Sequence, residues 1–284
     1  MKIIPCALLS LLVSASVYAQ QTADPGNFYA RFSAHTNAIQ SKQPNWPPPL
    51  VTTYTGLFQV VRTDFLRQIT PAHTDTWNID GSKCVSFIPF NRTEFDINLP
   101  PYIFHNTPAA KDGWGDMSFL GKFRVASGNQ QHGHYVISVY ALATVPTGQY
   151  KNGSTDASIA PNLAVGKGFG PLAIQTTAGT TLYTSKPATT TTGNPVAWNL
   201  ATQYHLHKYF WPEVESNATW FKGGTNHGKM QEFITPGILF GKFKLHPDDP
   251  KSRPGLTFGA GMQIATSRFH SYNHELVMTA RWIY

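Results

Sequence analysis

The end of the chain alternates apolar and polar side chains with a period of two and finishes on an aromatic ring. The apolar positions are Leu276, Met278, Ala280, Trp282 and Tyr284, and the positions that alternate with them include Glu275, Thr279 and Arg281. A period of two places successive side chains on opposite faces of a β-strand. This pattern up to a final aromatic ring is typical of the last strand of a transmembrane barrel, whose outer face meets lipid.

The same alternation recurs along the chain. Glu94 and Asp96 alternate with Phe95 and Ile97, and Lys122 and Arg124 alternate with Phe123 and Val125 in the next such stretch. Charged side chains that alternate with aromatic ones within a strand require a water-filled or well-paired face. The pattern therefore favours a sheet with one lipid face and one wetter face.

Turn residues divide the alternating stretches into about twelve strands, an even number as single-chain bacterial barrels have. They are expected near 54–66, 82–88, 92–100, 116–126, 133–145, 157–167, 171–184, 196–207, 211–221, 232–244, 255–266 and 273–284. The expected fold is all-β, a transmembrane antiparallel up-and-down β-barrel over residues 51–284. Pro89 could instead mark a bulge, because proline cannot donate to a strand ladder.

The first residues predict a secretory signal. Lys2 precedes an apolar stretch that ends in Val17-Tyr18-Ala19, which fits a small-x-small cleavage site. We expect residues 1–19 to be removed after Ala19 and the mature chain to reach the outer membrane of a Gram-negative bacterium. Cys84 is then the single cysteine that remains, so no internal disulfide is expected.

Residues 20–50 show no alternation. Residues 27–41 form a weak amphipathic helix candidate, and the following Trp46-Pro47-Pro48-Pro49 stretch favours an extended chain. This short helical and extended segment is either a plug folded into the barrel mouth or an extension that merely precedes the first strand.

Composition excludes several classes. Only 13% of residues are charged, against about 25% in ordinary soluble domains, and no mature stretch reaches the roughly 18 apolar residues of a membrane-spanning helix. The net charge is +7, but the cations are scattered rather than clustered. We therefore expect contact with outer-membrane lipid, lipopolysaccharide or anionic solutes, and no nucleic acid.

A second set of candidate lumen residues lies around a predicted turn at Phe210. A turn centred there would set His207 opposite Glu213 and His205 opposite Glu215, with all four side chains in the lumen. Histidine with carboxylate could bind a metal or transfer protons. The favoured interpretation is a cross-strand ladder that neutralises charge, without metal or cofactor.

The charged residues on neighbouring strands allow two interpretations. Glu94 and Asp96 are expected to face Lys122 and Arg124 across adjacent strands. The four side chains either compensate one another in the lumen wall or form a constriction that selects solutes by charge.

Several short motifs point to a known family. They are Gly113-Trp114-Gly115-Asp116, Val145-Pro146-Thr147-Gly148, Ile88-Pro89-Phe90-Asn91, Leu99-Pro100-Pro101-Tyr102 and the approach from Trp46 to Leu50. Over residues 45–284 the chain resembles the outer-membrane family named for the MetA pathway of phenol degradation. The resemblance implies a barrel and passage of aromatic compounds, and it implies no active-site residues.

The sequence as a whole predicts a channel or transporter for passive movement of small solutes, aromatic or hydrophobic compounds among them. No G-x-S-x-G, H-E-x-x-H or C-x-x-C motif occurs, and no catalytic residue is predicted. Two alternatives remain: a lipase-like barrel enzyme at the membrane surface, and a soluble secreted β-sandwich that binds a ligand.

Overall fold

The structure is a computed structural model that describes residues 28–80, 85–185, 191–249 and 252–284. The expected signal peptide lies outside the described residues. In chain order the elements are α2 (Phe28–Gln40), β1 (Val60–Ile69), β2 (Asp75–Ile79), β3 (Val85–Phe90), β4 (Thr93–Asn98), β5 (Tyr102–His105), β6 (Gly113–Trp114), β7 (Met117–Gly128), β8 (Tyr135–Val145), β9 (Ser158–Phe169), β10 (Leu172–Thr180), β11 (Leu182–Tyr183), β12 (Val196–Tyr204), β13 (Phe210–Trp220), β14 (Met230–Lys244), β15 (Gly255–Ala265) and β16 (His274–Ile283).

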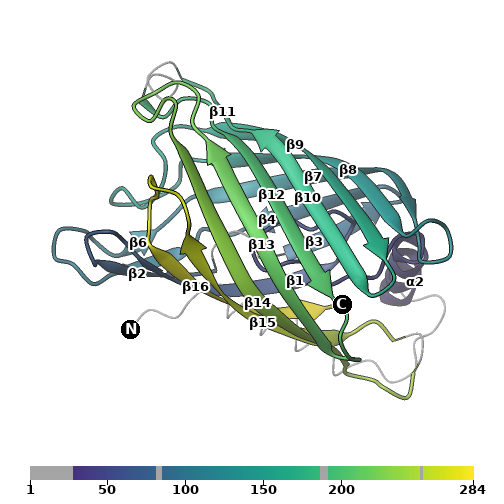
Figure 1. The fold of residues 1–284 in the computed structure, drawn as a ribbon. Coiled ribbons are helices and arrows are strands. Elements are labelled where there is room, and N and C mark those ends of the chain that lie inside the picture. Colours follow the sequence, from purple (N-terminus) through teal and green to yellow (C-terminus); the bar gives the residue numbers. More distant parts are fainter. Residues whose placement is uncertain (1–27, 81–84, 186–190, 250–251) are drawn as a thin grey trace.

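A closed antiparallel barrel of 12 strands forms the body of the molecule (Figure 1). Each strand pairs with its neighbour in the order β16-β15-β14-β13-β12-β10-β9-β8-β7-β4-β3-β1. The barrel closes where β1 pairs with β16 in one unbroken register from Val60–Ile283 to Ile69–His274. Closure excludes the soluble β-sandwich, which would leave two separate sheets.

The two ends of the barrel differ. Connections at 91–92 and 170–171 are tight, whereas those at 146–157 and 221–229 on the opposite end are long. At the long-loop end β2, β5 and β6 extend the wall beyond β1, because β2 pairs with the far half of β1 and β5 pairs with β2. We call the two ends the short-turn end and the long-loop end.

The strand limits agree closely with those expected from the alternation, except around Pro89 and at the start of the first strand. β3 and β4 are separate strands, and their register shifts between Phe87 and Phe90, around Pro89. The first strand begins at Val60 rather than near residue 54. Residues 54–59 lie inside the barrel instead of in its wall.

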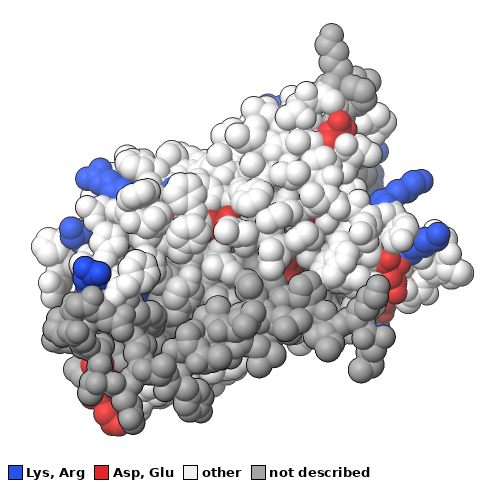
Figure 2. Space-filling view, turned by 180° about the vertical axis from the view of Figure 1, so that it is seen from behind, with Lys and Arg blue, Asp and Glu red and all other residues white. Residues whose placement is uncertain are grey.

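Side-chain burial follows the same period of two. Along β16 every second residue is buried, with Glu275, Val277, Thr279, Arg281 and Ile283 inward. On the face seen in Figure 2, lysine and arginine side chains lie towards the two ends, and the described surface between them is mostly uncharged. This distribution suits a lipid-facing band.

Aromatic rings project outward from several strand ends. Trp198, Tyr204 and Trp220 are all exposed, as the alternation predicts. Rings of this kind settle at the membrane–water interface. No helix in the described ranges is long and apolar enough to cross a membrane.

The chain between α2 and β1 occupies the interior of the barrel. We call residues 43–59 the lumen segment. Trp46, Leu50, Tyr54 and Leu57 within it are all at most 5% exposed. At its base, the Gln43 side-chain amide donates to the Leu57 carbonyl at 2.8 Å and accepts from the Leu57 amide at 3.0 Å, which ties the two ends of the segment together.

Helix α2 lies at the short-turn end (Figure 1). Its residue Ile39 is buried with Leu57 and Ile88, but Phe28 is 74% exposed. The expected apolar face of the helix is therefore only partly used.

Candidate functional site

The backbone of the lumen segment is held by carboxylates of the barrel wall. Glu215 accepts hydrogen bonds from the amides of Val51 at 2.8 Å and Thr52 at 2.6 Å. Glu213 accepts one from Leu50 at 3.0 Å. Two buried carboxylates of β13 thus satisfy three successive backbone donors that have no strand partner.

Arginines on the seam strands hold the carbonyls of the same stretch. Arg62 of β1 donates to the Leu50 carbonyl at 2.5 Å and pairs with Asp64 at 2.7 Å. Arg281 of β16 donates to the carbonyls of Pro48 and Pro49. Two buried guanidinium groups therefore donate hydrogen bonds to carbonyl groups of the proline-rich stretch that have no strand partner.

A third set of contacts lies on β4 and β7. The Lys122 ammonium group pairs with Glu94 at 2.6 Å and donates to the Gly56 carbonyl at 3.0 Å. The second Glu94 oxygen accepts from the Phe58 amide. This buried ion pair is completed by backbone groups of the lumen segment, as a desolvated pair requires.

Arg124 binds farther toward the short-turn end. It donates to the Ile39 carbonyl at 2.9 Å and to the Gln43 side chain at 2.8 Å. It therefore fixes the junction between α2 and the lumen segment.

Uncharged side chains of the wall add further hydrogen bonds around the lumen segment. Gln203 donates to Glu213 at 2.8 Å and accepts from Gln175 at 2.9 Å, and Gln175 accepts from the Thr55 hydroxyl at 2.9 Å. Ser138 donates to the Thr55 carbonyl at 2.7 Å. The wall thus contacts the lumen segment from strands around the whole barrel.

The apolar residues of the segment fit into glycine-lined hollows. A Cβ added at Gly261 would lie 2.7 Å from a methyl carbon of Leu50, and one at Gly259 would lie 2.8 Å from the other. A Cβ at Gly166 would lie 2.6 Å from the ring of Trp46. At these positions the wall needs residues without side chains.

Five of the sequence-predicted lumen residues therefore contact the segment directly: Glu94, Lys122, Arg124, Glu213 and Glu215. Asp96 is buried on the same inward row, in register with Ser86 and Leu120. An effect of these charges on ion selectivity stays a prediction.

The expected histidine–glutamate ladder is wrong. Glu213 lies opposite Gln203 and Glu215 lies opposite Ala201. β12 ends at Tyr204, so His205 and His207 belong to the turn 205–209 and are exposed. His205 instead stacks on Trp211, with ring centroids 4.2 Å apart. The turn is centred on Lys208, two residues before Phe210, which shifts the pairing and moves both histidines off the ladder.

A different histidine contacts the lumen segment. The indole N–H of Trp46 donates to Nε2 of His134 at 3.0 Å, in the turn before β8. Partial burial, with the nearby charge of Lys167, lowers the pKa of His134 below its ordinary value. Sequence reasoning missed this contact, because the two residues are far apart in the chain.

The lumen is hollow on both sides of the segment. A cavity of about 250 Å³ lies on the long-loop side and is lined by Arg62, Asp64, Phe233, Tyr272 and Glu275, among others. A larger cavity of about 770 Å³ opens at the short-turn end. The segment therefore separates two cavities of the lumen.

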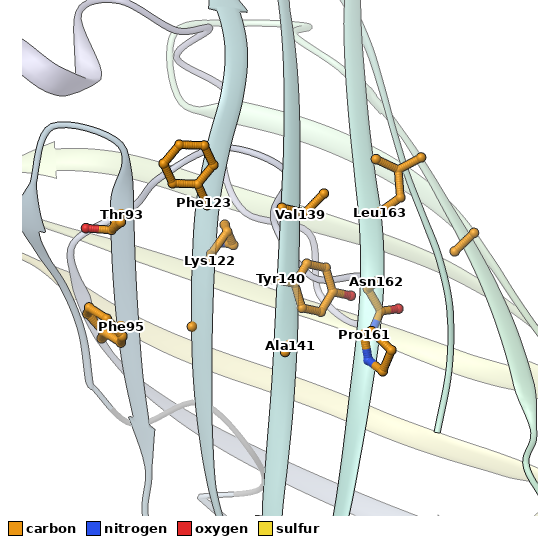
Figure 3. Close-up of a pocket in the computed structure, with 12 residues that line it drawn as sticks. Thr93, Phe95, Lys122, Phe123, Val139, Tyr140, Ala141, Pro161, Asn162 and Leu163 are labelled. Atoms are coloured by element: carbon orange, nitrogen blue, oxygen red, sulfur yellow. The ribbon is translucent and has the colours of Figure 1, made fainter. Parts of the chain in front are cut away.

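A further hollow lies on the outside of the wall (Figure 3). Gly121, Ala141 and Pro161 stand side by side on β7, β8 and β9, and leave a depression between larger outward residues. Phe95, Phe123, Val139 and Leu163 border it, while Lys122 belongs to the inward row. Its apolar lining suits contact with lipid chains.

Two of the motifs that carried the family resemblance meet in space. Asp116 accepts from the Gly148 amide at 2.9 Å and from the Ser154 amide at 2.6 Å. A Cβ at Gly148 would lie 2.5 Å from the backbone of Gly153. The G-x-G-D and V-P-T-G stretches therefore act as one clamp that shapes a long loop.

A closed antiparallel barrel with an uncharged outer band and a polar interior defines the chain as having the fold of an outer-membrane β-barrel. The model of the family described as "Putative MetA-pathway of phenol degradation" matches residues 35–232. The chain belongs to this family. No curated protein sequence matches it at a significant level.

Two solved structures share this fold. The COG4313 outer membrane channel from Pseudomonas putida F1 is 11% identical, with 84% of this chain and 99% of that chain covered and a TM-score of 0.60. The NanC porin is 12% identical, with 80% and 98% covered and a TM-score of 0.51.

Proposed function

We propose that the protein is an outer-membrane channel for passive movement of small solutes, aromatic or hydrophobic compounds among them, and that the lumen segment closes it. The short-turn end would face the periplasm and the long loops the exterior, where they meet lipopolysaccharide. The mature chain would begin after Ala19.

The observation that carries the proposal is the partition of the lumen. The cavities of about 250 Å³ and 770 Å³ lie on opposite sides of the lumen segment. The segment is not part of the wall, and hydrogen bonds and packing rather than strand pairing hold it. Movement of this one stretch would join the two cavities into one path.

The membership of a family named for phenol degradation supports aromatic solutes. The two solved structures of the same fold, an outer membrane channel and a porin, support the channel role.

A reversible cross-link tests the role of the segment. Thr52 and Asn217 contact each other, with 3.3 Å between Oγ1 and Nδ2. In a Cys84→Ser background, Thr52→Cys and Asn217→Cys would be joined by a disulfide or a short thiol-reactive linker. Conductance would be recorded in planar bilayers before and after joining, with Thr52→Cys alone as the control.

We expect discrete conductance steps that disappear on cross-linking and, for the disulfide, return on reduction. Conductance that ignores the cross-link would refute closure by this segment. A folded barrel that conducts neither with the segment nor after deletion of residues 43–59 would refute the channel. Phospholipid hydrolysis by the purified protein would favour the lipase-like enzyme instead.

A further inference from the structure

The cavity at the short-turn end has an unusual lining. We call this cavity the vestibule. Three lysines line it, Lys208, Lys242 and Lys244, and none of its described lining residues is an aspartate or glutamate. A concave space with cations on its wall and no carboxylate favours an anion.

Lys242 is the cation that lies deepest in this arrangement. It is half-buried on β14, and its side chain crosses Gly255 so closely that a Cβ there would lie 2.7 Å from Cε. The charged groups that act on it are Arg253 and Lys244, both cationic. Across the described ranges, no carboxylate lies within ion-pair distance of its ammonium group.

A half-buried ammonium group among cations is costly without a counter-ion. The contacts inside the lumen make the contrast plain, because Lys122 is paired there with Glu94 at 2.6 Å. The wall thus supplies a partner for one inward lysine and leaves the other facing a cavity.

Flat rings line the same space. Trp211 stacks on His205 with 8° between the ring planes, and Trp46 lies 5.1 Å from His134. Phe58 also borders the cavity. Aromatic side chains with a few charged groups are typical of small-molecule sites, and about 770 Å³ falls within the roughly 300–1,000 Å³ of such pockets.

We propose that the vestibule binds a small organic anion that carries a planar ring, with its carboxylate at Lys242 and its ring against Trp46 and Trp211. The inference names a solute class for the proposed channel and rests on that function for its role. Binding itself does not require conduction, so the two can fail separately.

The site is tested by titrating the refolded full-length mature protein with benzoate, with binding measured by calorimetry and tryptophan fluorescence. Phenol supplies the ring without the charge, and acetate supplies the charge without the ring. Lys242→Gln removes the central cation. Lys42→Gln is the matched control, because Lys42 is exposed at the same end and does not line the vestibule.

We expect benzoate to bind more tightly than phenol or acetate, and Lys242→Gln to weaken it about tenfold or more, as removal of a charged hydrogen bond does. Lys42→Gln should leave the affinity within about twofold, since an exposed charge contributes little. Trp211→Leu should reduce the preference for benzoate over acetate, in a sample whose heat-modifiability shows the barrel to be as well folded as in the wild type.

The inference is overturned by no benzoate binding to the wild-type protein, by equal affinity in Lys242→Gln, or by equal affinity for acetate or phenol. Lipid headgroups are a second source of anions. Titrations in nanodiscs with and without phosphatidylglycerol separate them, and loss of benzoate binding in the anionic lipid would assign the site to headgroups and overturn the solute. Binding without any conductance would refute the channel alone.

Discussion

Replacement of Glu215 by glutamine is the sharpest test of how the lumen segment is held. The carboxylate now accepts from two backbone amides, those of Val51 at 2.8 Å and Thr52 at 2.6 Å. Glutamine keeps the shape but has one acceptor oxygen, and it turns an NH₂ donor toward the other amide. One buried N–H is therefore left without an acceptor.

The size of the effect follows from these contacts. Loss of the charge from the remaining bond, with one unpaired buried N–H, costs about 2–4 kcal/mol. At about 1.4 kcal/mol per factor of ten, the equilibrium between closed and open lumen shifts about 30- to 700-fold toward the open form. This cost falls on the closed state, because water reaches both groups when the segment leaves.

The assay is the fraction of time that a single refolded protein conducts in a planar bilayer. Glu232→Gln is the matched control. Glu232 lies on β14 and accepts a hydrogen bond from the Ser216 hydroxyl at 3.2 Å, and it does not bond the lumen segment. We expect Glu215→Gln to raise the open fraction strongly and Glu232→Gln to leave it unchanged. If both variants conduct like the wild type, the carboxylate does not hold the segment and the reasoning is wrong.

Three further outcomes are expected. Lys122→Met should destabilise the barrel by about 3–5 kcal/mol in urea unfolding because it strands a buried carboxylate, and adding Glu94→Gln should recover part of this loss; no recovery would argue against the ion pair. Gly261→Leu should displace the lumen segment and raise conductance without loss of the heat-modifiable barrel, whereas an unchanged closed state would show that the glycine hollow is not needed. The pKa of His134 lies below its ordinary value of 6.5, so at neutral pH the imidazole is neutral and accepts the hydrogen bond from Trp46. The stability that this hydrogen bond contributes is lost as the pH falls through the folded-state pKa. Tryptophan fluorescence should therefore change on acidification in the wild type and not in Trp46→Phe, and identical titration curves would exclude the contact.

The wall of the barrel could be predicted because its rule is local. An inward residue such as Asp96 or Arg281 is identified by its apolar neighbours alone, with no knowledge of what lies across the lumen. Strand limits and faces depend on the same period of two.

The register at the turn after β12 could not be predicted with equal security. A turn centred two residues earlier shifts each partner by four residues, so Glu213 meets Gln203 rather than His207. Alternation fixes the face of a residue but not its partner, because the pattern is unchanged by a shift of two residues.

The position of the lumen segment depends on contacts that no local pattern contains. Thr52 and Glu215 are 163 residues apart, and the donor is a backbone amide that every sequence carries. One signal was present nevertheless. Inward positions at Gly166, Gly259 and Gly261 lack side chains, which in a filled barrel indicates that something else occupies the space.

The pairing of β1 with β16 has a consequence for biogenesis. The seam joins the first and last strands, so the cylinder cannot close until the final strand has been made. The lumen segment precedes β1 and is synthesised before any of the wall. Leu50 of the segment fits so closely against the wall glycines that little room remains for inserting the segment later. We therefore expect the sheet to close around a lumen segment that is already in place, with the pairing of β1 and β16 as the last step of assembly.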